Sequence, residues 1–226
     1  MQGFSEVFER RTAADVVFDQ LQQDVTTLKL LPGTRLSEAE VAKRFGVSRQ
    51  PVRDAFARLA NLDLLLIRPQ KATEVRGFSM ERIAHARFVR LAVELEVIQR
   101  ACAIWDDARE KELSRILDTQ YEAIAAKDIT AFHASDYAFH KGICDLAGYP
   151  LAFETIQSCK HKVDRLCVLS LGRQDEVDTL LNDHARIADA LSRGDVKDAT
   201  DSVRLHLSRL DDTIADIHAK HVEYFE

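Results

Sequence analysis

The second part of the sequence, residues 79–220, is a long succession of helical patterns with few residues that stop a helix. The whole chain has only 8 Gly and 4 Pro. The breaks that we predict in this part fall at the short segments WDDAR, AKDIT, LAGYP, LGRQD and SRGDV. No segment of it alternates apolar and polar residues in the way of a half-buried strand. The pattern predicts about six helices, which must cover their apolar stripes by packing together in a bundle.

Residues 12–76 have a different organisation, with three shorter helical patterns followed by a hairpin pattern. The first helix is predicted to begin after Thr12 as its N-cap and to stop before Gly33. The second begins after Ser37 and ends at Gly46, and the third begins after Ser48. Two short apolar runs then flank the tetrapeptide PQKA, which predicts a small β-hairpin with a basic tip.

Together these patterns predict a mainly α chain of two domains. Residues 1–78 are expected to form a winged helix-turn-helix, in which the small β-hairpin is the wing. Residues 79–226 are expected to form an all-helical bundle, within the usual size range of a domain.

The predicted helix-turn-helix concentrates basic side chains on a chain that is acidic as a whole. The formal net charge is −6, whereas residues 43–76 carry eight basic and three acidic side chains. In a helix-turn-helix the second helix enters the major groove of DNA, and its first turns contact base edges. Arginine suits guanine and glutamine suits adenine there, while other polar and basic groups bind phosphates. The alternative is a basic surface that is only hydrated. The candidate DNA contacts are Arg49, Arg53, Ser48, Gln50, Lys43, Arg68 and Lys71.

Three histidines and one aspartate occupy inward positions in the predicted bundle. Asp136 and His140 are four residues apart, about one turn, so they share one face of a helix. His184 and His206 each precede apolar residues at helical spacing, which directs their imidazoles toward the interior. Imidazoles and a carboxylate bind Zn²⁺ and other divalent metals, and bundles build such sites from facing helices. The pattern fits a shared metal site and a set of buried structural histidines about equally.

The segment LLPGTRLSEAEVAKRFGVSRQPVRDAFARLANLDLLLIRP, and above all GVSRQPVRDA within it, closely resembles the winged helix-turn-helix of the GntR family of bacterial transcription regulators. The resemblance implies that Arg49 and Arg53 contact double-stranded DNA, with Ser48, Gln50 and the wing beside them. It also implies a homodimer on a short palindromic operator.

Three positions in this segment depart from many members of the family. Ala39 stands where an arginine is common, and Asp63 stands where a glycine is common. The wing lacks the glycine often found near its tip, with Ala72 close to that place. Glycine permits a close approach of the backbone to DNA, so the resemblance implies contact in the major groove more directly than contact by the wing.

The bundle, residues 79–220, resembles the FCD domain of the FadR subfamily, an all-helical effector domain joined to a GntR-type DNA reader. The resemblance rests on D-x-x-F-H and two later histidines. Many FCD domains bind a divalent metal through one Asp and three His, and these correspond here to Asp136, His140, His184 and His206. Their effectors are mostly small carboxylates such as sugar acids and hydroxy acids.

A carboxylate effector also needs a cationic partner. Arg87 on the first bundle helix is a candidate, and Arg90 lies one turn further on. Arg165 is a second candidate because it lies on an otherwise apolar helix face, although it can equally pair with a structural acid. His161, one turn before Arg165, completes the candidate effector-binding residues.

No apolar run approaches the ~20 residues that span a bilayer. The first residues, MQGFSEVFERRTAADV, lack the apolar core of a signal peptide. We therefore expect a cytoplasmic protein without membrane contact. Its four cysteines form no C-x-x-C pair and are expected to be reduced thiols.

These observations predict a metabolite-responsive transcription regulator, a repressor rather than an enzyme, that senses a small carboxylate at a metal-containing site. Zn²⁺ is the expected metal, with Ni²⁺, Mn²⁺ or another first-row ion as alternatives. Two other functions remain open from the sequence. One is a metal-dependent hydrolase with an Asp/His₃ centre, and the other is a DNA-binding regulator whose metal site is purely structural.

Overall fold

The computed structural model describes residues 11–170 and 174–226, which fall into two compact units. The first unit runs to Phe78 and also contains Glu223–Glu226, and the second is Ser79–Val222. The last four residues, which we assigned to the bundle from the sequence, therefore lie with the first unit. The described chain is mainly helical with one small sheet, so the predicted fold class is confirmed.

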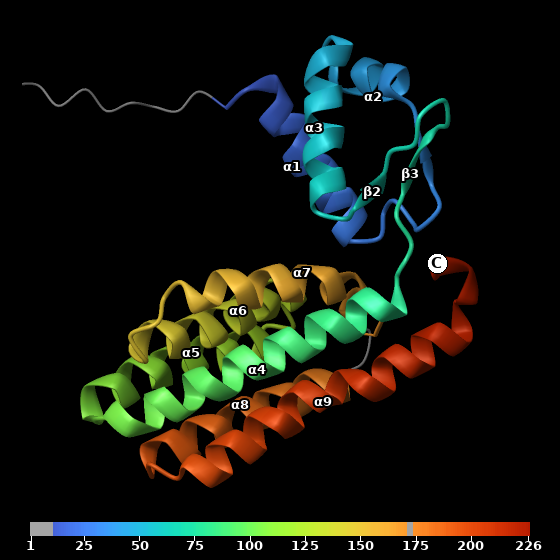
Figure 1. Ribbon diagram of the computed structural model, residues 1–226. Coiled ribbons are helices and arrows are strands. Elements are labelled where there is room, and N and C mark those ends of the chain that lie inside the picture. Colours follow the sequence, from blue (N-terminus) through green and yellow to red (C-terminus); the bar gives the residue numbers. More distant parts are fainter. Residues whose placement is uncertain (1–10, 171–173) are drawn as a thin grey trace, which may run out of the picture. The chain divides into compact units, whose positions relative to one another are not determined.

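The first unit contains three helices and three short strands (Figure 1). The helices are α1 (Ala13–Thr26), α2 (Glu38–Phe45) and α3 (Arg49–Asn61). The strands are β1 (Arg35–Leu36), β2 (Leu65–Leu66) and β3 (Thr73–Val75). The strands are ordered β1-β3-β2 with antiparallel pairing, so β2 and β3 form the predicted hairpin.

The core of the first unit lies where α1 and α3 pack on each other and on the sheet. Leu21, Phe56, Leu65 and Val75 are almost completely buried there. The three helices begin after Thr12, Ser37 and Ser48, as the sequence predicts. Of these three N-caps, only Thr12 uses its side chain, which accepts a hydrogen bond from the next turn of α1.

Two left-handed residues end α2 and α3 in the same way. Gly46 has φ +66° and Asp63 has φ +59°. The amide of Asp63 donates to the carbonyl of Ala60 at 3.0 Å, and that of Leu64 donates to Leu59 at 2.9 Å, the pattern of a Schellman motif. Asp63 thus adopts the conformation that favours glycine, because a short polar side chain tolerates it better than most.

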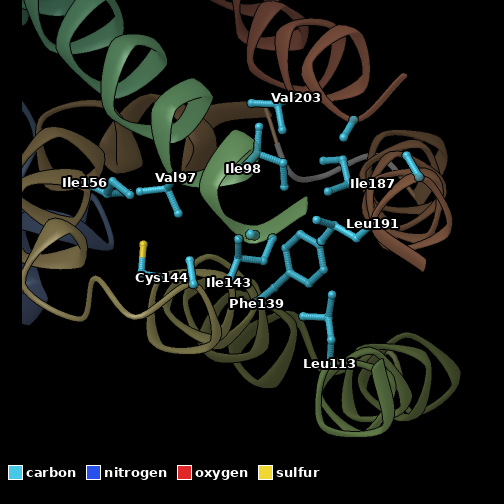
Figure 2. Packing of buried hydrophobic residues seen from close by; sticks show 14 of the residues in the cluster. Val97, Ile98, Leu113, Phe139, Ile143, Cys144, Ile156, Ile187, Leu191 and Val203 are labelled. Carbon is cyan, nitrogen blue, oxygen red and sulfur yellow. The ribbon is translucent and has the colours of Figure 1, made fainter. Parts of the chain in front are cut away.

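The second unit is a bundle, and its described residues form six helices. They are α4 (Met80–Ile104), α5 (Asp107–Ala125), α6 (Ile129–Leu146), α7 (Ala152–Ser170), α8 (Gln174–Ser192) and α9 (Val196–Lys220). Phe139 of α6 is fully buried near the middle of the core (Figure 2). Side chains from α4, α5 and α8, such as Ile98, Leu113 and Leu191, belong to the same apolar cluster.

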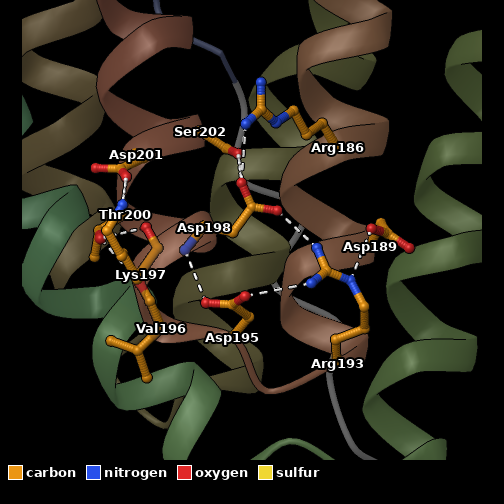
Figure 3. Close-up of polar contacts among 10 residues, drawn as sticks. All are labelled: Arg186, Asp189, Arg193, Asp195, Val196, Lys197, Asp198, Thr200, Asp201 and Ser202. Carbon is orange, nitrogen blue, oxygen red and sulfur yellow. Dashed lines mark hydrogen bonds and ion pairs between the residues drawn. The ribbon is translucent and has the colours of Figure 1, made fainter.

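An exposed network of charges fixes the turn between α8 and α9 (Figure 3). Arg186 of α8 and Arg193, which directly follows α8, both donate to Asp198 of α9, at 2.9 Å and 2.6 Å. Asp195 is the N-cap of α9 and accepts from the amide of Asp198 at 3.0 Å. Single surface ion pairs contribute little, but a shared aspartate ties the two helices together.

No helix in the described part of the chain is long and apolar enough to cross a membrane. Cys102, Cys144 and Cys159 are free thiols. The side chain of Cys167 lies outside the described residues.

Candidate functional site

The start of α3 presents an exposed polar surface in the first unit. Ser48, Arg49 and the preceding Lys43 of α2 are all exposed. Neither Arg49 nor Lys43 forms an ion pair within residues 11–170 and 174–226. Both charges therefore remain available to an external anion such as a phosphate.

Two other predicted DNA contacts are held by acidic neighbours. Arg53 donates Nε to Oε2 of Glu38 at 2.9 Å, and Gln50 donates to Oδ1 of Asp54 at the same distance. All four residues lie at the surface, so water competes for these bonds and each is worth little. The bonds hold both side chains in place without burying them.

The wing supplies one exposed cation and one restrained cation. The chain turns at residues 68–71, where the amide of Lys71 donates to the carbonyl of Arg68 at 3.2 Å. Gln70 takes the left-handed position of this turn with φ +59°, after a proline, as in a type II turn. Lys71 is exposed, whereas the guanidinium of Arg68 is held by Glu74 at 2.6 Å. Lys71 is thus the more accessible of the two predicted wing contacts.

The second unit brings together the four side chains that the sequence singled out as candidate metal ligands. Asp136 and His140 come from α6, His184 from α8 and His206 from α9, and one ligand atom of each lies within 4.8 Å of the other three. Nε2 of His184 lies 3.4 Å from Nε2 of His206 and 3.5 Å from Oδ1 of Asp136. Nε2 of His140 lies 3.8 Å from the same carboxylate oxygen. Three ring nitrogens and one oxygen therefore face a common point.

Neighbouring side chains fix the tautomers of two of these histidines. Nδ1 of His140 lies 2.9 Å from Oε2 of Glu94, and an ionised carboxylate only accepts. Nδ1 of His184 lies 2.9 Å from Oε1 of Gln120, whose own amide donates to the carbonyl of Ser135 at 3.0 Å. Both Nδ1 atoms are therefore donors, and both Nε2 atoms keep the lone pair that a metal ligand needs.

Asp136 is oriented in a comparable way. Its Oδ2 accepts from Nζ of the buried Lys160 at 2.5 Å, which leaves Oδ1 directed at the histidines. His206 is held less firmly, because its Nδ1 lies 3.8 Å from Oδ2 of Asp183, beyond hydrogen-bond length. Asp183 itself is bound by Arg209 at 3.1 Å and 3.3 Å.

The cluster is buried, and burial together with the neighbouring charges keeps its groups in ligand form. Burial lowers the pKa of His140 to about 4 and holds the pKa of His184 well below its ordinary value. Burial also acts to raise the pKa of Asp136, but Lys160 and the two histidines outweigh it and hold that pKa well below its usual range. At neutral pH two neutral imidazoles thus face an ionised carboxylate, the protonation states that metal binding requires.

This donor set fits a divalent first-row metal ion, but one neighbouring side chain, Arg90, would compete with the ion for Nε2 of His140. Three imidazoles and one carboxylate are typical ligands of Zn²⁺, Ni²⁺ and related ions. A terminal nitrogen of Arg90 lies 2.9 Å from Nε2 of His140, and Nε of Arg90 donates to Glu94 at 2.5 Å. Arg90 therefore uses the lone pair that His140 would offer to a metal.

A cavity of about 340 Å³ is lined by residues of α4, α7 and α9, with Arg90 among them. Its charged lining is Arg87, Arg90, Arg204 and Asp211, and the remainder is mostly apolar. Arg87 forms an ion pair with Asp211, whereas Arg204 is exposed. Arginine thus predominates among the charged groups of the cavity.

The other two predicted effector contacts are not part of this cavity lining. Arg165 is buried on α7, where burial lowers its pKa to about 10. His161 is exposed on α7 and its ring centroid lies 5.9 Å from that of Tyr137. The structure therefore brings Arg87 to the cavity but not Arg165 or His161.

Comparison with protein families accounts for both units. Residues 13–75 match the family described as bacterial regulatory proteins, gntR family, and residues 86–209 match the FCD domain. The chain belongs to the GntR family. It is a transcriptional regulator with a C-terminal FCD domain, and the predicted family is confirmed.

Relatives of this GntR regulator have the same type of function. This chain is 33% identical over 209 residues to the HTH-type transcriptional repressor RspR of Escherichia coli strain K12. The aligned residues cover 92% of each chain. The chain is 32% identical over 124 residues to the gluconate operon transcriptional repressor of Bacillus subtilis, over 55% of this chain and 51% of that one. The family consists of DNA-binding regulators and not of enzymes, so the hydrolase alternative is removed.

A solved structure shows the same fold. A protein from Rhodococcus sp. RHA1, described as a transcriptional regulator GntR, superposes with a TM-score of 0.72 at 24% identity. The match covers 90% of this regulator and 97% of that chain.

Four residues that contact the cluster were not predicted from the sequence as part of it. They are Arg90, Glu94, Gln120 and Lys160. Arg90 and Glu94 are four residues apart on one helix, a spacing that does signal a pair. Gln120 and Lys160 carry no such signal, because their partners lie on other helices.

Proposed function

We propose that this GntR regulator is a metal-dependent repressor that senses a small carboxylate in its bundle. Asp136, His140, His184 and His206 hold a divalent ion, Zn²⁺ or alternatively Ni²⁺ or Mn²⁺. The carboxylate, a sugar acid or hydroxy acid, completes the coordination of the ion and pairs with an arginine. The gluconate operon repressor among the relatives is consistent with an effector of this class.

The observation that carries this proposal is the arrangement of the histidines. Four donor atoms from three helices lie within 4.8 Å of one another. Glu94 and Gln120 hold Nδ1 of two of the rings, which turns their Nε2 lone pairs inward. Structural histidines need only one satisfied hydrogen bond each and do not require their lone pairs to converge.

In this proposal the DNA-reading surface consists of the first turns of α3, with Arg49, Gln50 and Arg53, and of the wing. A homodimer places two such surfaces on a palindromic operator in the cytoplasm. Effector binding changes DNA affinity only if the effector has different affinities for two arrangements of the dimer.

The metal assignment is tested by elemental analysis of the purified protein. We expect about one divalent ion per chain, and we expect the His184→Ala variant to lose it. His161→Ala, which changes an exposed histidine on a neighbouring helix, is the matched control and should retain the ion. Full metal occupancy in His184→Ala would refute the ligand set.

The DNA assignment is tested with an operator selected from random duplexes by the full-length protein. Arg49→Ala should weaken specific binding by about 1–3 kcal/mol, the range for one base contact. Arg100→Ala, on an exposed face of the bundle, is the control. Unchanged operator affinity in Arg49→Ala and in Arg53→Ala would contradict the assignment of α3 as the recognition helix.

A purely structural metal site is the second candidate, and the burial of the cluster favours it. His184 is completely buried, and the other three side chains are nearly so. A structural site predicts that chelation lowers the melting temperature and that no small carboxylate raises it. A sensing site predicts that chelation lowers the melting temperature and that a carboxylate raises it only when the metal is present.

A further inference from the structure

The chain passes between the two units twice, once at Phe78–Ser79 and once at Val222–Glu223. The first crossing leads directly into α4, because Ser79 is the N-cap of that helix. The second crossing follows α9, which ends at Lys220 with His221 as its C-cap. α4 and α9 pack against each other in the bundle. Both crossings are therefore short, and each is attached to the end of a bundle helix.

Within the first unit, the two segments that make these crossings are paired with each other. The amide of Phe78 donates to the carbonyl of Tyr224 at 2.7 Å, and the amide of Glu226 donates to the carbonyl of Phe78 at 2.9 Å. Phe78 and Phe225 form a β-bridge, and their rings lie 5.3 Å apart. The segment Glu223–Glu226, which we call the strap, is thus held to the first unit by both backbone and side-chain contacts.

The strap is also connected to the end of α3 through one arginine. Nε of Arg76 donates to Oε1 of Glu226 at 2.9 Å, and Nη1 of Arg76 donates to Oδ1 of Asp63 at the same distance. Asp63 is the left-handed residue that follows α3. The side chain of Arg76 is only 18% exposed, so water competes for these bonds less than it does at an open surface. Two consecutive ion pairs therefore join the strap to the end of α3.

On its other side, the strap continues from the helix that carries one of the candidate metal ligands. His206 lies on α9, and Nδ1 of its ring has no hydrogen-bond partner among residues 11–170 and 174–226. The ring of His140, by contrast, is bonded to Glu94 of α4. Coordination of both rings by one ion fixes His206 with respect to His140, and it thereby fixes α9 with respect to α4. The two short crossings start from the ends of these same two helices.

We propose that the strap couples the metal site to the DNA-reading surface, because it attaches the first unit to α9 as well as to α4. This inference rests on the proposed function and names the segment that carries its regulation. A unit joined by one crossing can turn about that crossing, whereas a second short crossing restricts the turn. The arrangement of the first unit then depends on how the end of α9 lies with respect to the start of α4. Metal binding favours one such arrangement and so changes DNA affinity.

The test lengthens the second crossing without removing the contacts of the strap. Gly-Ser-Gly-Ser inserted between His221 and Val222 adds up to about 14 Å of slack, at ~3.5 Å per residue. Operator affinity of the full-length, metal-stripped protein is measured by fluorescence anisotropy with and without Zn²⁺. Zn²⁺ should tighten operator binding by the unaltered protein roughly 5- to 150-fold, the usual range of coupling between two sites. The insertion variant should bind Zn²⁺ equally well, but its operator affinity should change less than about twofold.

The same four residues placed after Glu226 are the matched control, because they add an equal length outside the crossing. This variant should respond to Zn²⁺ as the unaltered protein does. A second variant opens the strap by substitution, since Phe225→Ala with Glu226→Gln removes the ring contact and the ion pair with Arg76. It should also lose the response to Zn²⁺. It decides the question if the insertion variant fails to fold in a thermal unfolding check.

The outcomes separate this inference from the function on which it rests. If the unaltered protein binds no Zn²⁺, both are overturned. If it binds Zn²⁺ and His184→Ala does not, but Zn²⁺ leaves operator affinity unchanged, the metal site stands and the coupling is overturned. An insertion variant that responds to Zn²⁺ as the unaltered protein does would overturn the role of the strap alone. Loss of operator binding in the insertion variant, with and without Zn²⁺ alike, would show that the strap only supports the fold of the first unit, and would also overturn the coupling.

Discussion

Among single residues, Gln120 shows how a side chain that is not a candidate metal ligand orients one that is, His184. It is fully buried and uses both ends of its amide, one for the carbonyl of Ser135 and the other for Nδ1 of His184. A hydroxyl in this place would not fix the tautomer of His184, because a hydroxyl can either donate or accept. The amide nitrogen of Gln120 already donates to Ser135, so its oxygen, which can only accept, faces His184. His184 therefore presents a lone pair and not a proton to the cluster.

Replacing Gln120 tests this role. Gln120→Leu keeps the volume but leaves Nδ1 of His184 without an acceptor, and it should weaken Zn²⁺ binding about 10–100-fold. The measurement is chelator competition on the full-length protein. Gln99→Leu, at an exposed glutamine that donates to the carbonyl of Leu95, is the control. Equal affinity in both variants would show that Gln120 does not orient His184.

Asp63 is a second residue whose role follows from its backbone. Its φ of +59° is costly for most residues, and its carboxylate accepts from Arg76 at 2.9 Å. Asp63→Ala should lower the free energy of unfolding of the first unit by about 1–2 kcal/mol, and Asp63→Gly by less, because glycine favours this conformation. Urea unfolding measures both. A larger loss for glycine than for alanine would contradict the backbone argument.

At the scale of elements, the start of α1 is secured by a reciprocal cap. Asp15 accepts from the amide of Thr12 at 3.0 Å and from its hydroxyl at 2.7 Å, and Arg58 of α3 donates to the same carboxylate. The hydrogen bonds from Thr12, followed by that from Arg58, lower the pKa of Asp15 to about 2. This cap joins α1 to α3.

The cap predicts a defined pH dependence. The folded pKa of Asp15 lies below its ordinary value of 3.8, so its stabilisation is complete well above that value and is lost as the pH falls toward 2. Asp15→Asn should lower the melting temperature by a constant amount between about pH 7 and 5, and the difference should shrink below about pH 4. Asp19→Asn, at an exposed position on the same helix, serves as the control. A difference that grew toward acid pH would refute this assignment.

For the whole molecule, the end of the chain belongs to a unit that begins two hundred residues earlier in the sequence. The amide of Phe78 donates to the carbonyl of Tyr224 at 2.7 Å, and the amide of Glu226 donates back to Phe78 at 2.9 Å. The rings of Phe78 and Phe225 lie 5.3 Å apart. A Cβ on Gly77 would lie 2.9 Å from the carbonyl oxygen of Tyr224, so this approach requires glycine.

Loss of this contact should weaken the first unit. Phe225→Ala removes the ring that packs on the buried Phe78 and should lower the free energy of unfolding of that unit by about 1–2 kcal/mol. Unfolding followed separately for the two units, by hydrogen exchange of their amides, measures the effect. Val222→Ala, at an exposed residue just before this segment, should change little. Equal protection of the first unit in Phe225→Ala and the unaltered protein would contradict the prediction.

The sequence by itself determined the helix starts at Thr12, Ser37 and Ser48, the left-handed end of α2 at Gly46, and the family. It also singled out the four side chains of the cluster. Caps, turns and apolar spacing are local signals, because each depends on residues a few positions apart. The motif GVSRQPVRDA is equally local, and so it was readable without a structure.

Only the tertiary structure decided what surrounds those four side chains. Gln120, Lys160 and the cluster meet because α5, α7 and the ligand-bearing helices pack together, and no local pattern records such a meeting. The sequence offered Arg87 as an effector contact but did not indicate that Arg90 reaches His140, since the rotation of α4 about its axis is set by packing. The contact between Phe225 and Phe78 could not be predicted from the sequence either, because the two residues are far apart along the chain and meet only in the folded protein.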